Sequence, residues 1–123
     1  MATLSAFPNP CLDHTQKRLN IHEYLVEQEN ATYFVRVCSN AMRDIGMLPK
    51  DVAVVVRAKK AAVGDIVLAV VDGEFTIKQL TKGENGNVIL QPANPDFKPI
   101  EIKEGMDCEI WGVVTGSFRK YSP

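Results

Sequence analysis

The sequence predicts a mainly β domain, in which a rolled or partly closed antiparallel sheet carries one or two short helices. Beyond residue 30 the chain consists largely of short runs rich in β-branched and aromatic residues, which favour strands. Turn-forming pairs such as Asp72-Gly73 separate neighbouring runs at close spacing. Apolar residues make up 46% of the 123 residues and charged residues 24%, which is the balance of an ordinary globular domain.

The first part of the chain predicts an extended arm and one short helix. Residues 1–19 are rich in Pro, Thr, Asn and charge, and proline removes a backbone donor and favours extended geometry before it. Asn20 and Glu23 have the spacing of a capping box, which predicts a helix over 21–28. We therefore expect the arm and helix to occupy 1–30 and the β-rich domain to occupy 31–123.

The strands are expected where apolar or β-branched runs are bounded by turn residues. Asp72-Gly73 predicts a tight type I′ hairpin, because Gly accepts the positive φ that this turn requires. A single helical turn is expected over 42–46. The strands predicted in this way are 32–37, 52–57, 65–71, 74–80, 88–90 and 109–117.

Charge and composition exclude several classes of function. Fourteen basic and fifteen acidic residues leave a net charge of −1. The chain therefore lacks the basic surface expected of a protein that binds nucleic acid directly and sequence-specifically. The longest apolar run, 66–71, is too short to cross a bilayer, and the first residues do not form a signal peptide, which predicts a cytoplasmic protein without a membrane partner. Cys11, Cys38 and Cys108 form no C-x-x-C pair, so we expect reduced thiols, no metal site and no cofactor.

Two segments carry residues with possible chemistry. Lys78 lies in the predicted strand 74–80, either as a solvated lysine on the outer face or as a sheltered amine of lowered pKa that acts as general base toward a serine. The segment 37–42 joins a strand to a helical turn, where backbone N–H groups can stabilise an oxyanion. Its Ser39 and Cys38 are interpreted as a turn serine and a core cysteine. The residues alone leave the role of Lys78 open.

An ordered set of motifs resembles the LexA/UmuD family of self-cleaving serine–lysine peptidases, in the processed form of its UmuD-type members. No single motif carries the resemblance, but the order and spacing of several motifs do, and the most specific of them is the one that ends in Lys78. The motifs are Phe-Pro-Asn-Pro at 7–10, Ala-Thr-Tyr-Phe-Val at 31–35, Ser-Asn-Ala-Met at 39–42, Gly-Asp-Ile-Val at 64–67, Asp-Gly-Glu-Phe-Thr-Ile-Lys at 72–78 and Ile-Trp-Gly-Val-Val at 110–114.

The resemblance implies a site in which Lys78 is the general base and Ala41 occupies the position of the serine nucleophile. Asn40 and Met42 would then flank the oxyanion site. Since Ala41 has no hydroxyl, the sequence as written is expected to be inactive as an endopeptidase. An engineered serine-to-alanine change and a naturally inactive relative both account for Ala41.

The resemblance also implies that such a peptidase cuts its own N-terminal arm. The bond at which members of the family cut corresponds here to Ser5-Ala6.

The partners implied by the resemblance are those of the SOS response to DNA damage. They are a second copy of the chain, the catalytic subunit of a UmuC-like Y-family polymerase in translesion synthesis, and the RecA filament on single-stranded DNA. One alternative is an active self-protease when a serine replaces Ala41. Another is the dimerisation and autocleavage domain of a LexA-like repressor, although 1–30 is too short and too rich in proline for a helix-turn-helix domain.

Overall fold

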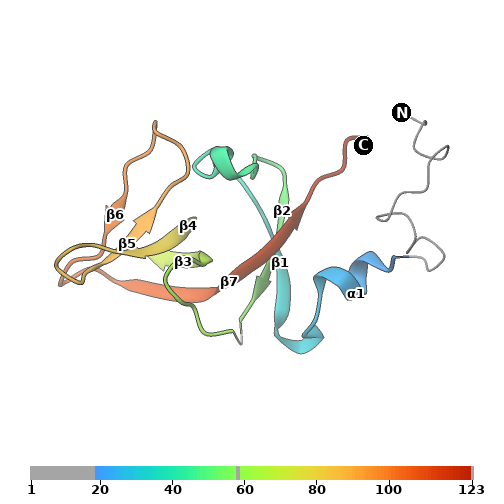
Figure 1. Cartoon of the computed structure of the whole chain (residues 1–123), viewed down its shortest axis with the longest axis horizontal. Coiled ribbons are helices and arrows are strands. Elements are labelled where there is room, and N and C mark those ends of the chain that lie inside the picture. Colours follow the sequence, from blue (N-terminus) through green and yellow to red (C-terminus); the bar gives the residue numbers. More distant parts are fainter. Residues whose placement is uncertain (1–18, 58, 123) are drawn as a thin grey trace, which may run out of the picture.

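A computed structural model of the chain describes residues 19–57 and 59–122, so residues 1–18 of the predicted arm lie outside the described residues. The model confirms the mainly β prediction (Figure 1). In chain order the elements are α1 (Ile21–Leu25), the 3₁₀ helix η3 (Glu29–Ala31), β1 (Thr32–Arg36), the 3₁₀ helix η4 (Arg43–Ile45), β2 (Val52–Val56), β3 (Ile66–Val71), β4 (Glu74–Lys82), β5 (Val88–Gln91), β6 (Ile100–Glu101) and β7 (Cys108–Phe118).

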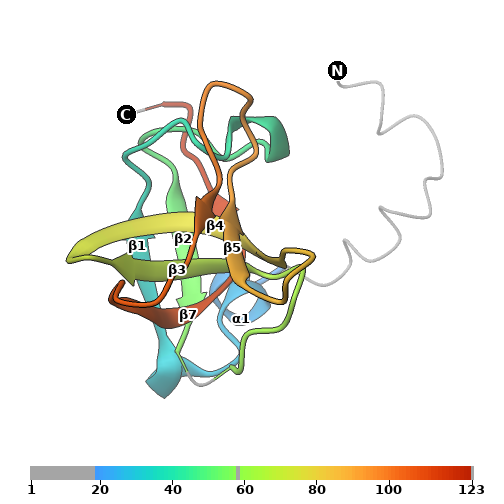
Figure 2. The same cartoon turned by 90° about the vertical axis from the view of Figure 1, so that its left-hand side faces the viewer.

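The described strands form one open antiparallel sheet in the order β1-β2-β7-β3-β4-β5-β6. The long strand β7 lies between β2 and β3, and Figure 1 shows it running between the two halves of the molecule. Its register shifts once against β2, between Val54 and Val55, and once against β3, between Leu68 and Ala69. Such bulges bend a strand and increase its twist. As a result β3 and β4 cross β1 and β2 at a steep angle, which is visible in the turned view of Figure 2.

The hairpin between β3 and β4 confirms the turn prediction. Asp72 and Gly73 have φ of 48° and 86°, the positive values that a two-residue type I′ turn requires. The turn sets the register, so that Val71 pairs with Glu74 and Val67 pairs with Lys78. A local sequence signal therefore decides which residue of β3 lies opposite Lys78.

Both faces of β3 are buried, which agrees with its continuous apolar run. Leu68 belongs to a core cluster formed by the β1–β2 connection and the middle of the sheet, whose buried members are Val37, Met42, Met47, Ala53, Val55, Leu68 and Val114. Val67 and Ala69 point to the opposite face, where they form a second cluster with Leu90 of β5. The first cluster is the one that supports the candidate site.

Two elements differ from the prediction. Asn20 caps α1 as expected, its side chain accepting a hydrogen bond from the N–H of Glu23 at 3.1 Å, but the helix ends at Leu25 instead of residue 28. The chain becomes extended at Val26 (φ −117°, ψ 95°), and this side chain is buried whereas none in α1 is. Burial of one valine outside the helix thus overrides the helical periodicity. The two-residue strand β6 was not predicted, because it is too short to show a pattern.

Candidate functional site

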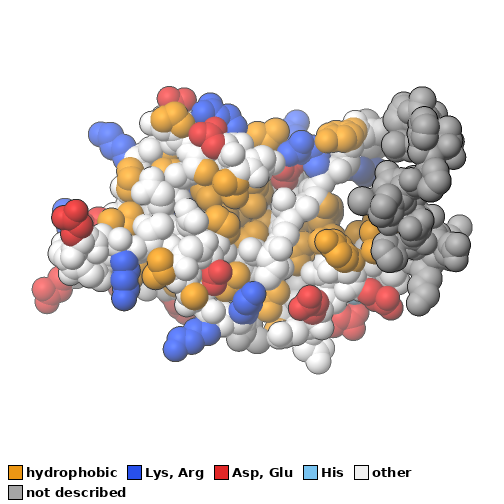
Figure 3. All heavy atoms as spheres, in the orientation of Figure 1, with side chains coloured by type: hydrophobic (Ala, Val, Ile, Leu, Met, Phe, Trp, Pro, Cys, Tyr) orange, Lys and Arg blue, Asp and Glu red, His pale blue; other side chains and the backbone are white. Residues whose placement is uncertain are grey.

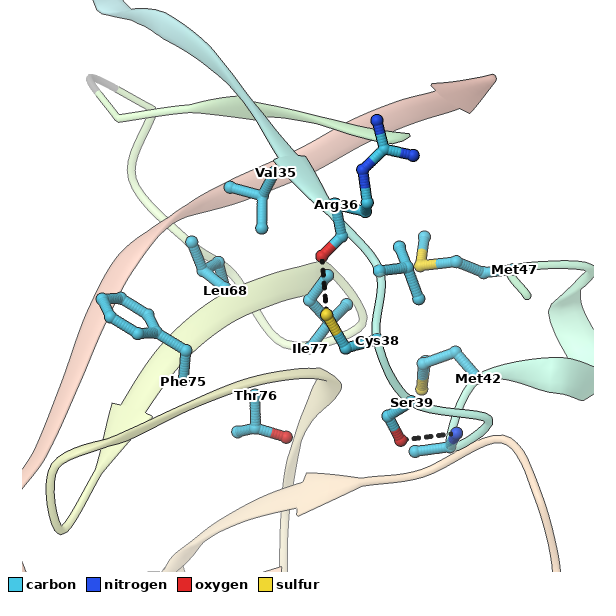
Figure 4. Close-up of a pocket in the computed structure, with 12 residues that line it drawn as sticks. Val35, Arg36, Cys38, Ser39, Met42, Met47, Leu68, Phe75, Thr76 and Ile77 are labelled. Atoms are coloured by element: carbon cyan, nitrogen blue, oxygen red, sulfur yellow. Dashed lines mark hydrogen bonds between the residues drawn. The ribbon is translucent and has the colours of Figure 1, made fainter. Parts of the chain in front are cut away.

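The end of β1 and the turn over 38–47 that follows it form one wall of an apolar pocket of about 150 Å³. Figure 3 shows hydrophobic side chains gathered in the middle of this face of the molecule. The opposite wall belongs to the β3–β4 hairpin, as Figure 4 shows. The lining residues of the β1 side are Val35, Arg36, Val37, Cys38, Ser39, Ala41, Met42 and Met47, and those of the hairpin are Leu68, Phe75, Thr76 and Ile77.

Ala41 is held at the pocket by its backbone. Its carbonyl oxygen accepts a hydrogen bond from the N–H of Ala93 at 2.8 Å, and the carbonyl of Asn40 accepts one from Asn94 Nδ2 at 2.9 Å. The N–H of Asp44 in turn donates to the carbonyl of Ala93 at 2.8 Å. Since Ala93 and Asn94 follow β5, which pairs with β4, these bonds fix the turn relative to the strand that carries Lys78.

Lys78 is buried, with only 7% of its surface exposed. It lies opposite the fully buried Val67, and its Nζ donates a hydrogen bond to Thr76 Oγ1. Desolvation lowers the pKa of Lys78 below its ordinary value of 10.5, because burial disfavours the charged ammonium. The alternative of a solvated lysine on the outer face is therefore wrong. A general base needs this shift toward the neutral amine.

Thr76 connects the lysine to the pocket. It lines the same pocket as Ala41, and its hydroxyl is the described partner of Lys78 Nζ. The structure thus brings Ala41 and Thr76 around one pocket and places Lys78 against Thr76, while the pairing of Ala41 with Lys78 stays a prediction. Thr76 was not predicted as a site residue, although its position two residues before Lys78 on the same strand face was a usable signal.

The other predicted site residues occupy different positions in this turn. Met42 is 2% exposed and packs in the first core cluster, so it supports the turn and does not face solvent. Asn40 is exposed. The predicted cut bond Ser5-Ala6 lies outside the described residues.

Neither side chain with a nucleophilic atom in this turn is bonded to Lys78. Ser39 Oγ accepts the N–H of Ala41 at 3.0 Å, and Cys38 Sγ contacts the carbonyl of Arg36 at 3.7 Å (Figure 4). Ala41 itself is 2% exposed and has only a methyl group. Within the described residues the turn therefore offers no hydroxyl or thiol paired with the buried amine.

Asp51, which directly precedes β2, forms an ion pair with Arg119, which directly follows β7. Arg119 Nε lies 2.6 Å from Asp51 Oδ1, and its Nη2 donates to Asp51 Oδ2 and to the carbonyl of Gly46, both at 2.9 Å. The N–H of Leu48 donates to the same Oδ2 at 2.9 Å. The bonds from Arg119 lower the pKa of the buried Asp51 carboxyl. This pair was not predictable from the sequence, since 68 positions separate its members.

Metal ligation has no support in the part of the chain that the structure describes. No group of three His, Cys, Asp or Glu side chains there is arranged to hold an ion. The two described cysteines, Cys38 and Cys108, are both free thiols.

The open antiparallel sheet is that of a LexA-like protease domain. The family model for Peptidase S24-like proteins matches residues 4–115, and the chain belongs to this family. No helix among residues 19–57 and 59–122 is long and apolar enough to span a membrane.

Curated relatives agree with this assignment. Protein MucA of Salmonella typhimurium is 40% identical over 118 residues, which cover 95% of this chain and 80% of MucA. Protein SamA of Salmonella typhimurium is 36% identical over 116 residues, 94% of this chain and 79% of SamA. The LexA repressor of Clostridium perfringens is 36% identical over 96 residues, which cover 78% of this chain and 45% of the repressor. The predicted resemblance to the LexA/UmuD family is confirmed.

Proposed function

We propose that this chain is a UmuD-like accessory protein of SOS mutagenesis whose serine–lysine site has lost its nucleophile. The observation that carries the proposal is the buried Lys78, held by Thr76 at the edge of the pocket that Ala41 lines. Burying an ammonium is costly, so a buried amine of lowered pKa beside a pocket favours a site derived from catalysis. With alanine at position 41 the site binds a peptide without cutting it.

The chemistry of the ancestral site follows from these positions. A serine at position 41 would attack the carbonyl carbon of the peptide bond through Oγ, while the neutral amine of Lys78 takes the hydroxyl proton. When the tetrahedral intermediate collapses, the C–N bond breaks and the Lys78 ammonium returns the proton to the leaving amine. Water then hydrolyses the ester, with Lys78 again accepting the proton. Thr76 Oγ1 accepts an N–H of Lys78 throughout and so orients its lone pair.

Replacing Ala41 by serine tests the site. Ala41→Ser should release the N-terminal fragment that ends at Ser5 during incubation at mildly alkaline pH, as measured by intact-mass spectrometry. The matched control, Ala41→Ser with Lys78→Met, should remain uncut because it lacks the base. Cleavage that persists without Lys78, or no cleavage in Ala41→Ser, would contradict the proposed site.

The role in mutagenesis is that of a binding subunit. We propose a homodimer that joins the catalytic subunit of a UmuC-like Y-family polymerase, with the RecA filament on single-stranded DNA as its activating partner. The family membership supports this role, and the net charge of −1 fits a protein that reaches DNA through partners. We place this action in the cytoplasm.

An exposed aromatic pair supports the homodimer. Phe34 on β1 and Phe118 on β7 pack edge to face, with ring centroids 5.9 Å apart, and both remain exposed. We propose that a second copy of the chain covers this aromatic pair. Phe34→Asp should therefore lower the mass measured by sedimentation equilibrium toward that of a monomer.

Two measurements test the polymerase role. In bacteria without their own UmuD-type protein, this chain should restore damage-induced mutation when its polymerase subunit is present, and it should co-purify with that subunit. Lys78→Met should restore mutation equally well, because a binding subunit does not need the base. Failure of both restoration and co-purification would overturn the role.

A further inference from the structure

The side chain of Ser39 accepts a hydrogen bond from the backbone N–H of Ala41, the residue at the position of the missing nucleophile. Its Oγ accepts the N–H of Ala41 at 3.0 Å, a bond that Figure 4 shows beside the pocket. The hydroxyl thus reaches two residues forward and forms a local turn of the kind that serine favours.

This N–H matters for any acyl transfer from position 41. When a side chain attacks a carbonyl carbon, negative charge develops on the carbonyl oxygen, and backbone N–H groups next to the nucleophile are well placed to stabilise it. The N–H of the nucleophilic residue itself commonly serves as one of these donors.

We infer that Ser39 masks the oxyanion donor of this site, so that the turn lacks a free N–H as well as a nucleophile. This inference rests on the proposed serine–lysine site. A serine at position 41 would then restore the nucleophile without freeing this N–H. The hydrogen bond from Ala41 N–H to Ser39 would therefore limit the rate of self-cleavage.

The surrounding contacts hold the backbone of the turn in place, so the N–H of Ala41 becomes free only when the side chain of Ser39 rotates away. The carbonyl groups of Asn40 and Ala41 are bound by Asn94 and Ala93, so the turn is held in one orientation. Ser39 is exposed and can rotate its hydroxyl away at the cost of one neutral hydrogen bond. We therefore expect a partial inhibition.

The cleavage test uses three variants of the full chain. Ser39→Ala combined with Ala41→Ser removes the masking hydroxyl, and it should form the N-terminal fragment roughly two- to tenfold faster than Ala41→Ser alone. Ser39→Thr combined with Ala41→Ser retains a hydroxyl and is the matched control, so its rate should stay close to that of Ala41→Ser. The fragment is followed by intact-mass spectrometry.

A second measurement does not depend on activity. In the unaltered background, Ser39→Ala should make the amide proton of Ala41 exchange with solvent about tenfold faster, as followed by NMR, while Ser39→Thr should leave it nearly unchanged.

The outcomes separate the two proposals. Equal cleavage rates in all three variants, or unchanged exchange at Ala41, would overturn the masking and leave the serine–lysine site standing. No cleavage in any variant would overturn the site itself, and the masking of its donor would fall with it. Faster cleavage and faster exchange in Ser39→Ala would support both.

Discussion

Arg119, one residue beyond β7, holds both carboxyl oxygens of Asp51, at 2.6 Å and 2.9 Å. Asp51 is only 2% exposed, so its charge depends on this guanidinium and on the N–H of Leu48. The same Arg119 also donates to the carbonyl of Gly46, near the end of the site turn. Hydrogen bonds from Arg119 therefore link the C-terminal end of β7 to the turn of the candidate site.

Removing the arginine should destabilise the fold. Arg119→Ala leaves a buried carboxylate without its cation, and we expect the free energy of unfolding to fall clearly. Chemical denaturation with urea measures this change. Arg36→Ala is the control, because Arg36 at the end of β1 is exposed and its side chain donates to the carbonyl of Lys50 without contacting a buried charge. A loss in Arg119→Ala no larger than that in Arg36→Ala would contradict the assigned role.

The same pair predicts acid sensitivity. Arg119 lowers the pKa of the folded Asp51 carboxyl below its ordinary value of 3.8. Between these two values the unfolded state binds more protons, so the stabilisation is complete above about pH 5 and is lost as the pH falls through the lowered pKa. Urea unfolding should show a difference between the unaltered chain and Asp51→Asn that shrinks below about pH 4. A difference that stays constant from pH 7 to about pH 3 would argue against it.

Burial of Lys78 should cost stability at neutral pH. Its folded pKa is lowered by desolvation, so the unfolded state binds more protons between this value and the ordinary 10.5, and the free energy of unfolding rises with pH in that range. Lys78→Met should stabilise the fold by about 1 kcal/mol at pH 7, with the gain fading toward pH 10.5. Lys82→Met, at the exposed end of the same strand, should change little. A destabilised Lys78→Met variant would indicate a structural role for the amine.

Gly112 should not tolerate a side chain. A Cβ placed there would lie 2.6 Å from Val55 Cγ1 and 2.9 Å from the carbonyl oxygen of Val56, so β2 and β7 would have to separate. We expect Gly112→Ala to lower the free energy of unfolding by about 2 kcal/mol. Gly116→Ala is the matched control on the same strand, because its Cβ would meet only Leu25 Cδ2 at 3.5 Å. Thermal unfolding of the two variants compares them directly, and equal melting temperatures would refute the steric argument.

Local chemistry made several features predictable. The Asp72-Gly73 turn needs only positive φ at two adjacent residues, and the Asn20 cap needs only one side chain within three positions of its donor. The family and its mainly β fold were also predictable, from the order of the motifs. By contrast, the end of α1 was not, because burial of Val26 depends on the rest of the domain.

The sequence by itself determined the type of fold, the hairpin register and the identity of the residues at positions 41 and 78. The tertiary structure alone decided that Lys78 is buried against Thr76, that Ala93 and Asn94 hold the site turn, and that Arg119 neutralises Asp51. Strand periodicity assigns a side chain to a face of the sheet, but desolvation and ion pairing depend on which distant segments cover that face.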